Sequence, residues 1–173
     1  MIDFIEFLKD IFGYAIIIAL IILIRIFVLV PIEVVGTSME PNLKNGDIIL
    51  MDKVAYNYFK LKRFDVIVSE YDSPKHIVKR IIGLPGDKIR YIDNKLFINE
   101  KEVEEKFNKY GVIEDYSLKE LDYERIPEDM YFVIGDNRED SVDSRSFGLI
   151  HQEEIEGKPL LVIWPLNHFK LVK

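Results

Sequence analysis

Residues 76–87 read His-Ile-Val-Lys-Arg-Ile-Ile-Gly-Leu-Pro-Gly-Asp, an apolar run followed at once by a turn signal. Its β-branched residues predict a strand over 76–82, and its Pro-Gly pair predicts a turn. Because side chains alternate along a strand, Lys79 would share a face with Ile77 and Ile81. A lysine on an apolar face either snorkels past the sheet edge or has a desolvated ammonium group.

Desolvation would give Lys79 a chemical use. Burial disfavours the charged amine and lowers its pKa from about 10.4 toward neutrality. A shift to about 8 would cost roughly 3 kcal/mol, which a domain-sized core can bear. Since a neutral lysine can act as a general base, Lys79 is the first candidate for catalysis.

Similar short segments elsewhere indicate a mostly β fold. The further strands that we expect, rich in Ile, Val, Leu and aromatic residues, are 47–53, 65–70, 88–91, 95–98, 130–134 and 159–164. The Asp93-Asn94 pair between two alternating segments predicts a β-hairpin. Residues 100–129 carry many charges and only scattered apolar side chains, so we expect a charged, solvated insert or long connection there.

The N-terminus holds a long apolar run. It is apolar or small without interruption from residue 11 to 24 and continues after Arg25 to residue 30, which is the length of a bilayer-spanning helix. We expect one transmembrane helix over about 11–30 within an anchor of residues 1–30, followed by one β domain over 31–173.

Two other interpretations of the run are weaker. A cleaved signal peptide would have a basic segment before the run and a small-residue cleavage site after it. A buried core helix would have a polar face, which the run lacks. The flanking charges show no clear positive-inside bias, so composition leaves the orientation open.

Composition narrows the function classes. The 30 acidic residues outnumber the 23 basic residues, and the net charge of −7 argues against nucleic acid as a partner. The chain has no cysteine, which excludes disulfides, thiol catalysis and Cys-ligated metal sites. Its 173 residues suffice for one domain with a core.

A second candidate for chemistry is the segment Gly36-Thr-Ser-Met-Glu-Pro-Asn-Leu43, which follows the apolar run. Its glycine and proline also fit an ordinary turn. A nucleophilic serine, however, needs an exposed and fixed backbone position, and a glycine-bounded turn beside Met39 would supply one for Ser38.

A third candidate is the polar segment Gly135-Asp-Asn-Arg-Glu-Asp-Ser-Val-Asp-Ser-Arg-Ser-Phe-Gly148. It fits a charged surface loop, and Asp136, Asp140 and Asp143 also make a metal loop conceivable. The oxygen spacing and closing Glu of an EF-hand are absent, and Asp143 with Arg145 suits an ion pair better than a metal. The three histidines, at 76, 151 and 168, lie in contexts that suggest no Ser-His-Asp triad.

These blocks, in this order after one apolar run, resemble bacterial signal peptidase I. The matching segments are 36–43, 46–50, 79–87 and 135–148. The resemblance implies a mostly antiparallel β fold and a serine endopeptidase with a Ser/Lys dyad. It implies a single-pass protein of the cytoplasmic membrane, in contact with lipid, whose catalytic domain lies on the extracytoplasmic side. The substrates would be signal peptides of exported preproteins, with no cofactor and no metal.

The resemblance also implies roles for individual residues. Ser38 would be the nucleophile and Lys79 the general base. Ser141 would orient the lysine, supported by an ion pair between Asp143 and Arg145.

Two further features concern the substrate. Met39 would line a shallow apolar pocket that accepts small side chains. Some family members use a serine two positions before the nucleophile as an oxyanion donor, but Gly36 stands there in this chain. The backbone N–H of Ser38 would then be the main donor.

Three rival functions stay open. A self-cleaving, repressor-type Ser/Lys peptidase would lack the anchor, and no DNA-binding region is evident. The eukaryotic or archaeal type of signal peptidase would carry histidine where Lys79 stands. A non-catalytic anchored domain that binds peptides would explain the strands and the apolar run, but not a lysine on an apolar face.

Overall fold

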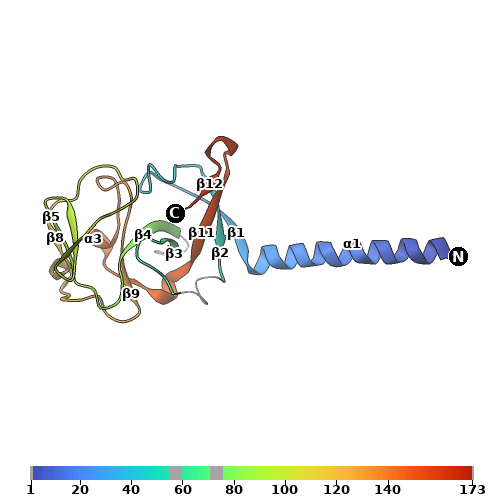
Figure 1. The fold of residues 1–173 in the computed structure, drawn as a ribbon, viewed down its shortest axis with the longest axis horizontal. Coiled ribbons are helices and arrows are strands. Elements are labelled where there is room, and N and C mark those ends of the chain that lie inside the picture. The colour runs from blue at the N-terminus through green and yellow to red at the C-terminus, as the bar shows by residue number, and fades with distance from the viewer. Residues whose placement is uncertain (1, 55–59, 71–75, 173) are drawn as a thin grey trace.

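The computed structural model describes residues 2–54, 60–70 and 76–172. One long helix, α1 (Ile2–Phe27), extends away from a β domain built by the rest of the chain (Figure 1). Its described apolar side chains, such as Phe12 and Ile18, are largely exposed. Within the described part of the chain, no helix combines the length and the apolar character needed to cross a membrane.

The chain leaves the helix earlier than the apolar run predicts. The expected helix over about 11–30 extends too far at its C-terminal end, because α1, which already begins at Ile2, ends at Phe27 and strand β1 (Leu29–Glu33) follows it almost directly. β1 pairs antiparallel with β2 (Ile48–Asp52), which draws the last residues of the run into the sheet. β1 lies at the sheet edge, where its Pro31 is tolerated.

Two antiparallel sheets form the domain, which confirms the mostly β class. In spatial order, the larger sheet contains β1, β2, β11 (Ile155–Trp164), β3 (Val66–Glu70), β4 (His76–Gly83), β9 (Met130–Ile134) and β10 (Ile150–His151), with β12 (Lys170–Leu171) paired to β11. The smaller sheet contains β7 (Lys101–Val103), β6 (Lys95–Ile98), β5 (Ile89–Ile92) and β8 (Tyr116–Ser117). Short helical turns connect them: η1 (Leu118–Leu121), α3 (Ser144–Phe147), η2 (Gln152–Glu154) and η3 (Leu166–His168).

The strands expected from apolar patterns are present, and the predicted hairpin is confirmed. β5 and β6 pair around Asp93 and Asn94, whose φ values of 48° and 61° are those a tight two-residue hairpin turn requires. β11 is longer than the expected 159–164. Gly157 and Pro159 are residues that strands disfavour, so the sequence pattern did not indicate its first half as a strand.

Gly157 marks the point where β11 changes partners. Gly157 itself pairs with Val68 of β3, while Lys158 pairs with Asp52 of β2. A Cβ atom on Gly157 would lie 2.3 Å from the carbonyl oxygen of Asp52. The glycine therefore permits the close backbone approach that joins β2 to the strands carrying the site.

Residues 100–129 are less solvated than their charge predicts. They include β7, β8 and η1, and Ile113, Tyr116, Leu118 and Ile126 pack into a buried cluster with residues of β5, β6 and β9. The expectation of a solvated insert is wrong for these side chains. Their apolar positions look scattered in sequence because each element here is too short to show a period.

We expect Gly157→Ala to lower the free energy of unfolding by about 1–3 kcal/mol, because the added methyl group overlaps the Asp52 backbone. Urea denaturation measures the change. Gly13→Ala in α1, where a Cβ would meet no atom within 4 Å, is the control and should not lower stability. Equal midpoints for Gly157→Ala and the parent would contradict the constraint.

Candidate active site

Lys79 lies in the middle of the larger sheet. It is on β4, pairs with Ile67 of β3 and is only 4% exposed. Its Nζ donates a hydrogen bond of 3.2 Å to Oγ of Ser141. The sheet therefore buries the amine and aims it at a residue of the segment after β9.

Burial lowers the pKa of Lys79 from 10.5 to about 8. The negative charge of Asp143 opposes this shift, as do Asp136 and Asp140 more weakly, while the positive charge of Arg145 adds to it. Desolvation outweighs the carboxylates. A large fraction of the amine is consequently neutral at mildly alkaline pH, which is the state that a general base requires.

Asp143 fixes the segment that carries Ser141. Its buried carboxylate makes two hydrogen bonds of 2.8 Å with Arg145, accepts the backbone N–H of Gly135 at 3.1 Å and caps α3. Burial alone would raise the pKa of Asp143, but Arg145, the Gly135 N–H and the Ser141 hydroxyl hold it below its usual value. The expected ion pair between Asp143 and Arg145 is present.

Ser38 is half-buried in the connection between β1 and β2. Its carbonyl oxygen accepts a hydrogen bond of 3.0 Å from the backbone N–H of Asn137. A Cβ atom on Gly135 would lie 2.4 Å from this oxygen and 2.3 Å from Oγ of Ser141. The backbone of Ser38 and the side chain that binds Lys79 thus flank the same glycine.

Further contacts hold the Ser38 connection in place. The hydroxyl of Thr37 donates a 2.5 Å hydrogen bond to Asp140, and the amide of Asn42 donates one of 2.7 Å to Asp136. The N–H of Gly36 donates to Oδ1 of Asn45 at 2.8 Å.

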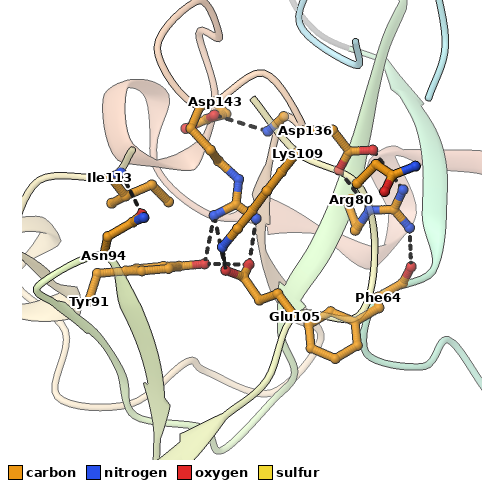
Figure 2. Close-up of polar contacts among 12 residues, drawn as sticks. Phe64, Arg80, Tyr91, Asn94, Glu105, Lys109, Ile113, Asp136 and Asp143 are labelled. Atoms are coloured by element: carbon orange, nitrogen blue, oxygen red, sulfur yellow. Dashed lines mark hydrogen bonds and ion pairs between the residues drawn. The ribbon is translucent and has the colours of Figure 1, made fainter. Parts of the chain in front are cut away.

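Asp136 has a buried partner that the motifs did not indicate. Arg80, the neighbour of Lys79, binds this carboxylate through Nε and Nη2 at 2.7 Å each, with both side chains buried (Figure 2). An arginine inside an apolar strand needs a buried anion, and this signal could have revealed the pair. Asp136, Asp140 and Asp143, which a metal loop would have used, bind Arg80, Thr37 and Arg145 respectively.

A groove of about 510 Å³ opens beside Ser38. Its walls come from β1, the Ser38 connection and β4, and consist of Ile32, Glu33, Val34, Val35, Ser38, Met39, His76, Ile77 and Val78. Met39 is almost fully buried in this wall. Because most of these side chains are aliphatic, the groove suits small apolar groups.

Comparison with known proteins agrees with this geometry. The family described as "Signal peptidase, peptidase S26" matches residues 5–164. The chain belongs to the signal peptidase I family. Signal peptidase IB of Staphylococcus aureus (strain COL) is 33% identical over 178 residues, which cover 95% of this chain and 93% of the relative. Signal peptidase I of Bacillus caldolyticus is 37% identical over 155 residues, covering 84% and 85%.

A solved structure gives the same result. The crystal structure of a signal peptidase I from Enterococcus faecalis V583 is 36% identical and matches with a TM-score of 0.51, covering 58% of this chain and 97% of that chain. The antiparallel β fold is therefore signal-peptidase-like. The protein is a serine endopeptidase, a hydrolase of the signal peptidase family.

We expect Lys79→Met to raise the free energy of unfolding at pH 7 by about 1–3 kcal/mol. Because its pKa is depressed, protonated Lys79 destabilises the folded chain by roughly 3 kcal/mol relative to the unfolded chain, and the substitution removes this penalty. Loss of the hydrogen bond to Ser141 offsets about 1 kcal/mol of that gain in stability. Between about pH 8 and 10.5 the unfolded parent protein binds more protons than the folded parent protein, so its free energy of unfolding rises with pH. The stability difference between Lys79→Met and the parent therefore becomes smaller as the pH rises through this range.

Urea denaturation across this pH range tests the expectation. Lys119→Met, at an exposed position, is the control and should leave the free energy of unfolding at pH 7 close to that of the parent. A Lys79→Met gain that stays constant with pH would show that Lys79 is not desolvated.

Proposed function

We propose that this chain cleaves signal peptides from exported preproteins, with Ser38 as nucleophile and Lys79 as general base. The observation that carries the proposal is the buried Lys79, whose pKa falls to about 8 and whose amine binds Ser141. Family membership supports the signal-peptide substrate, and the groove beside Ser38 supports an apolar recognition segment.

In the proposed reaction, neutral Lys79 takes the proton from Oγ of Ser38 as that oxygen attacks the scissile carbonyl carbon. The resulting ammonium then gives the proton to the leaving amine, and the signal peptide remains as an ester on Ser38. Lys79 next removes a proton from water, whose oxygen attacks the ester carbonyl carbon. The bond from this carbon to Oγ of Ser38 breaks, the ammonium of Lys79 returns its proton to that oxygen, and the signal peptide leaves as a free acid. Ser141 and the Asp143–Arg145 pair hold the lysine in position throughout.

The tetrahedral intermediates need hydrogen-bond donors for their negative oxygen. We assign the main donor to the backbone N–H of Ser38. Gly36 has no side-chain hydroxyl, and its backbone N–H already donates to Oδ1 of Asn45, so Gly36 offers the oxyanion no donor.

The groove would bind the residues just before the cut. It is lined by Met39, Val34, Val35 and Val78, whose apolar side chains favour small side chains at the first and third positions before the scissile bond. An added methylene changes binding only modestly in such a pocket, so the preference would be steric.

We further propose that α1 anchors the enzyme in the cytoplasmic membrane as a single-pass helix, with the β domain on the extracytoplasmic side. The long apolar run and the exposure of its described side chains support an anchor. The extension of α1 away from the β domain fits this role (Figure 1). Tethering would raise the local concentration of enzyme where signal peptides emerge.

The dyad is tested by incubating purified protein with a preprotein. We expect Ser38→Ala and Lys79→Ala to lower cleavage by at least 1,000-fold, as is typical for loss of a catalytic nucleophile or base. For the parent, kcat/KM should rise with pH and level off above about 8, as Lys79 loses its proton. Parent-like cleavage by both variants, or a flat pH profile from 6 to 9, would refute the dyad.

The anchor is tested by deleting residues 2–27, which leaves β1 intact. We expect the shortened protein to stay at the bottom of a flotation gradient with lipid vesicles, whereas the full chain floats. Its cleavage of a short soluble peptide should be unchanged. Flotation of the shortened protein to the same extent as the parent would place the membrane attachment elsewhere.

A further inference from the structure

Residues 105–110, Glu-Lys-Phe-Asn-Lys-Tyr, follow β7 and lie against the polar segment after β9. We call them the strap. Nothing in their composition marks them as part of a site, yet they contact three separate segments: those that carry Ser38, Lys79 and Ser141.

The first contact is with the segment that carries Ser141. The N–H of Tyr110 donates to the carbonyl of Asp136 at 3.0 Å, and the N–H of Arg138 donates to the carbonyl of Tyr110 at 2.9 Å. In addition, the carboxylate of Glu105 forms an ion pair with the guanidinium of Arg138. The strap therefore binds the backbone on both sides of Asn137, the residue whose N–H binds Ser38.

The Glu105–Arg138 pair is buried and specifically oriented. The side chains are 3% and 0% exposed, and the hydroxyl of Tyr91 lies 3.0 Å from Glu105 and 3.3 Å from Arg138. Burial alone would raise the pKa of Glu105, but Arg138 and Lys109 hold it below its usual value. Glu105 is thus a fixed negative charge, and displacement of Arg138 would remove the buried cation that it binds, leaving only the ion pair with Lys109.

The second contact is with the strand that carries Lys79. The ring of Phe107 lies 4.2 Å from the guanidinium carbon of Arg80 and 5.6 Å from that of Arg138. These are cation–π distances. One aromatic ring consequently joins the residue next to Lys79 to the segment that carries Ser141.

The third contact is with the connection that carries Ser38. The side-chain amide of Asn42 donates a hydrogen bond of 2.7 Å to the carbonyl of Asn108 and another of 2.7 Å to Asp136. The strap and the Arg80–Asp136 pair therefore hold this connection together.

We propose that the strap sets the relative positions of the three catalytic segments, and that Glu105 is a positioning residue acting through Arg138. This inference rests on the proposed function, because it concerns the alignment of Ser38 with Lys79. Among the described residues that line the groove beside Ser38, none belongs to the strap. Loosening the strap should therefore impair the chemical step and leave substrate binding intact.

The test is Glu105→Gln, which keeps the size of the side chain and removes its charge. With a preprotein substrate, we expect kcat to fall about tenfold or more and KM to change less than twofold. Glu100→Gln is the matched control, since Glu100 also forms ion pairs with two basic residues, Lys88 and Arg90, but is 52% exposed. Its kcat and KM should equal those of the parent.

Hydrogen exchange supplies a readout that does not depend on activity. In Glu105→Gln, the amides of Asn137 and Arg138 should exchange faster than in the parent, while the amides of β3 should not change. The proposal would be overturned if the kcat of Glu105→Gln equalled that of the parent or fell no further than the kcat of Glu100→Gln. Unchanged exchange rates at the amides of both Asn137 and Arg138 would also overturn it. If Glu105→Gln does not fold, Phe107→Leu is judged by the same criteria.

The two proposals fail in different ways. Full activity of Ser38→Ala would refute the dyad, and the exchange of Asn137 and Arg138 would still decide whether the strap holds the Ser38 connection. Normal kcat in Glu105→Gln together with an inactive Ser38→Ala would refute the strap alone.

Discussion

The desolvation of Lys79 is the constraint on which the rest of the structure depends. An amine in water stays protonated near neutral pH, so a lysine can serve as a base only where its charged form is costly. The larger sheet creates that cost by holding Lys79 on a central strand. This cost lowers the free energy of unfolding. Neighbouring interactions must therefore keep the amine buried without raising its pKa again.

The carboxylates around Lys79 show how this balance is kept. Asp143 and Asp136 both favour the ammonium, and unpaired they would raise the pKa of Lys79 again. Each is bound instead to a guanidinium, Arg145 or Arg80. Arginine is suited to this task because it remains charged when buried and binds a carboxylate through two parallel hydrogen bonds. The pairs thus provide rigid polar anchors while their opposing charges partly cancel at the lysine.

Part of this arrangement could be predicted from the sequence. The strand over 76–82, the turn after it and the Asp93-Asn94 hairpin follow from apolar alternation and turn chemistry, which are local properties. The same apolar alternation also places Lys79 on an apolar face of its strand. Arg80 could have been recognised by the same argument, since it lies in the same apolar strand and the acidic Asp136 stands two residues after the end of another apolar strand, β9.

The remainder could not be predicted because its causes are not local. Glu105 stands among other charged residues, and nothing in that stretch distinguishes the one carboxylate that is buried from those that are solvated. Its partner Arg138 lies 33 residues further along the chain. The early end of α1 likewise depends on pairing with β2, which an apolar run cannot reveal.

The identity of the site residues can be read from local sequence patterns, whereas the geometry of the site depends on long-range contacts. Thr37 and Asp140, which join the Ser38 connection to the Ser141 segment, are 103 residues apart, and Arg80 and Asp136 are 56 apart. Short motifs can name such residues, but only the completed sheets bring them together. A site assembled from long-range contacts needs an element that spans its parts, and residues 105–110 contact the segments that carry Ser38, Lys79 and Ser141. Glu105, whose charge suggests solvation when read alone, binds the buried Arg138, and the ring of Phe107 contacts the buried Arg80.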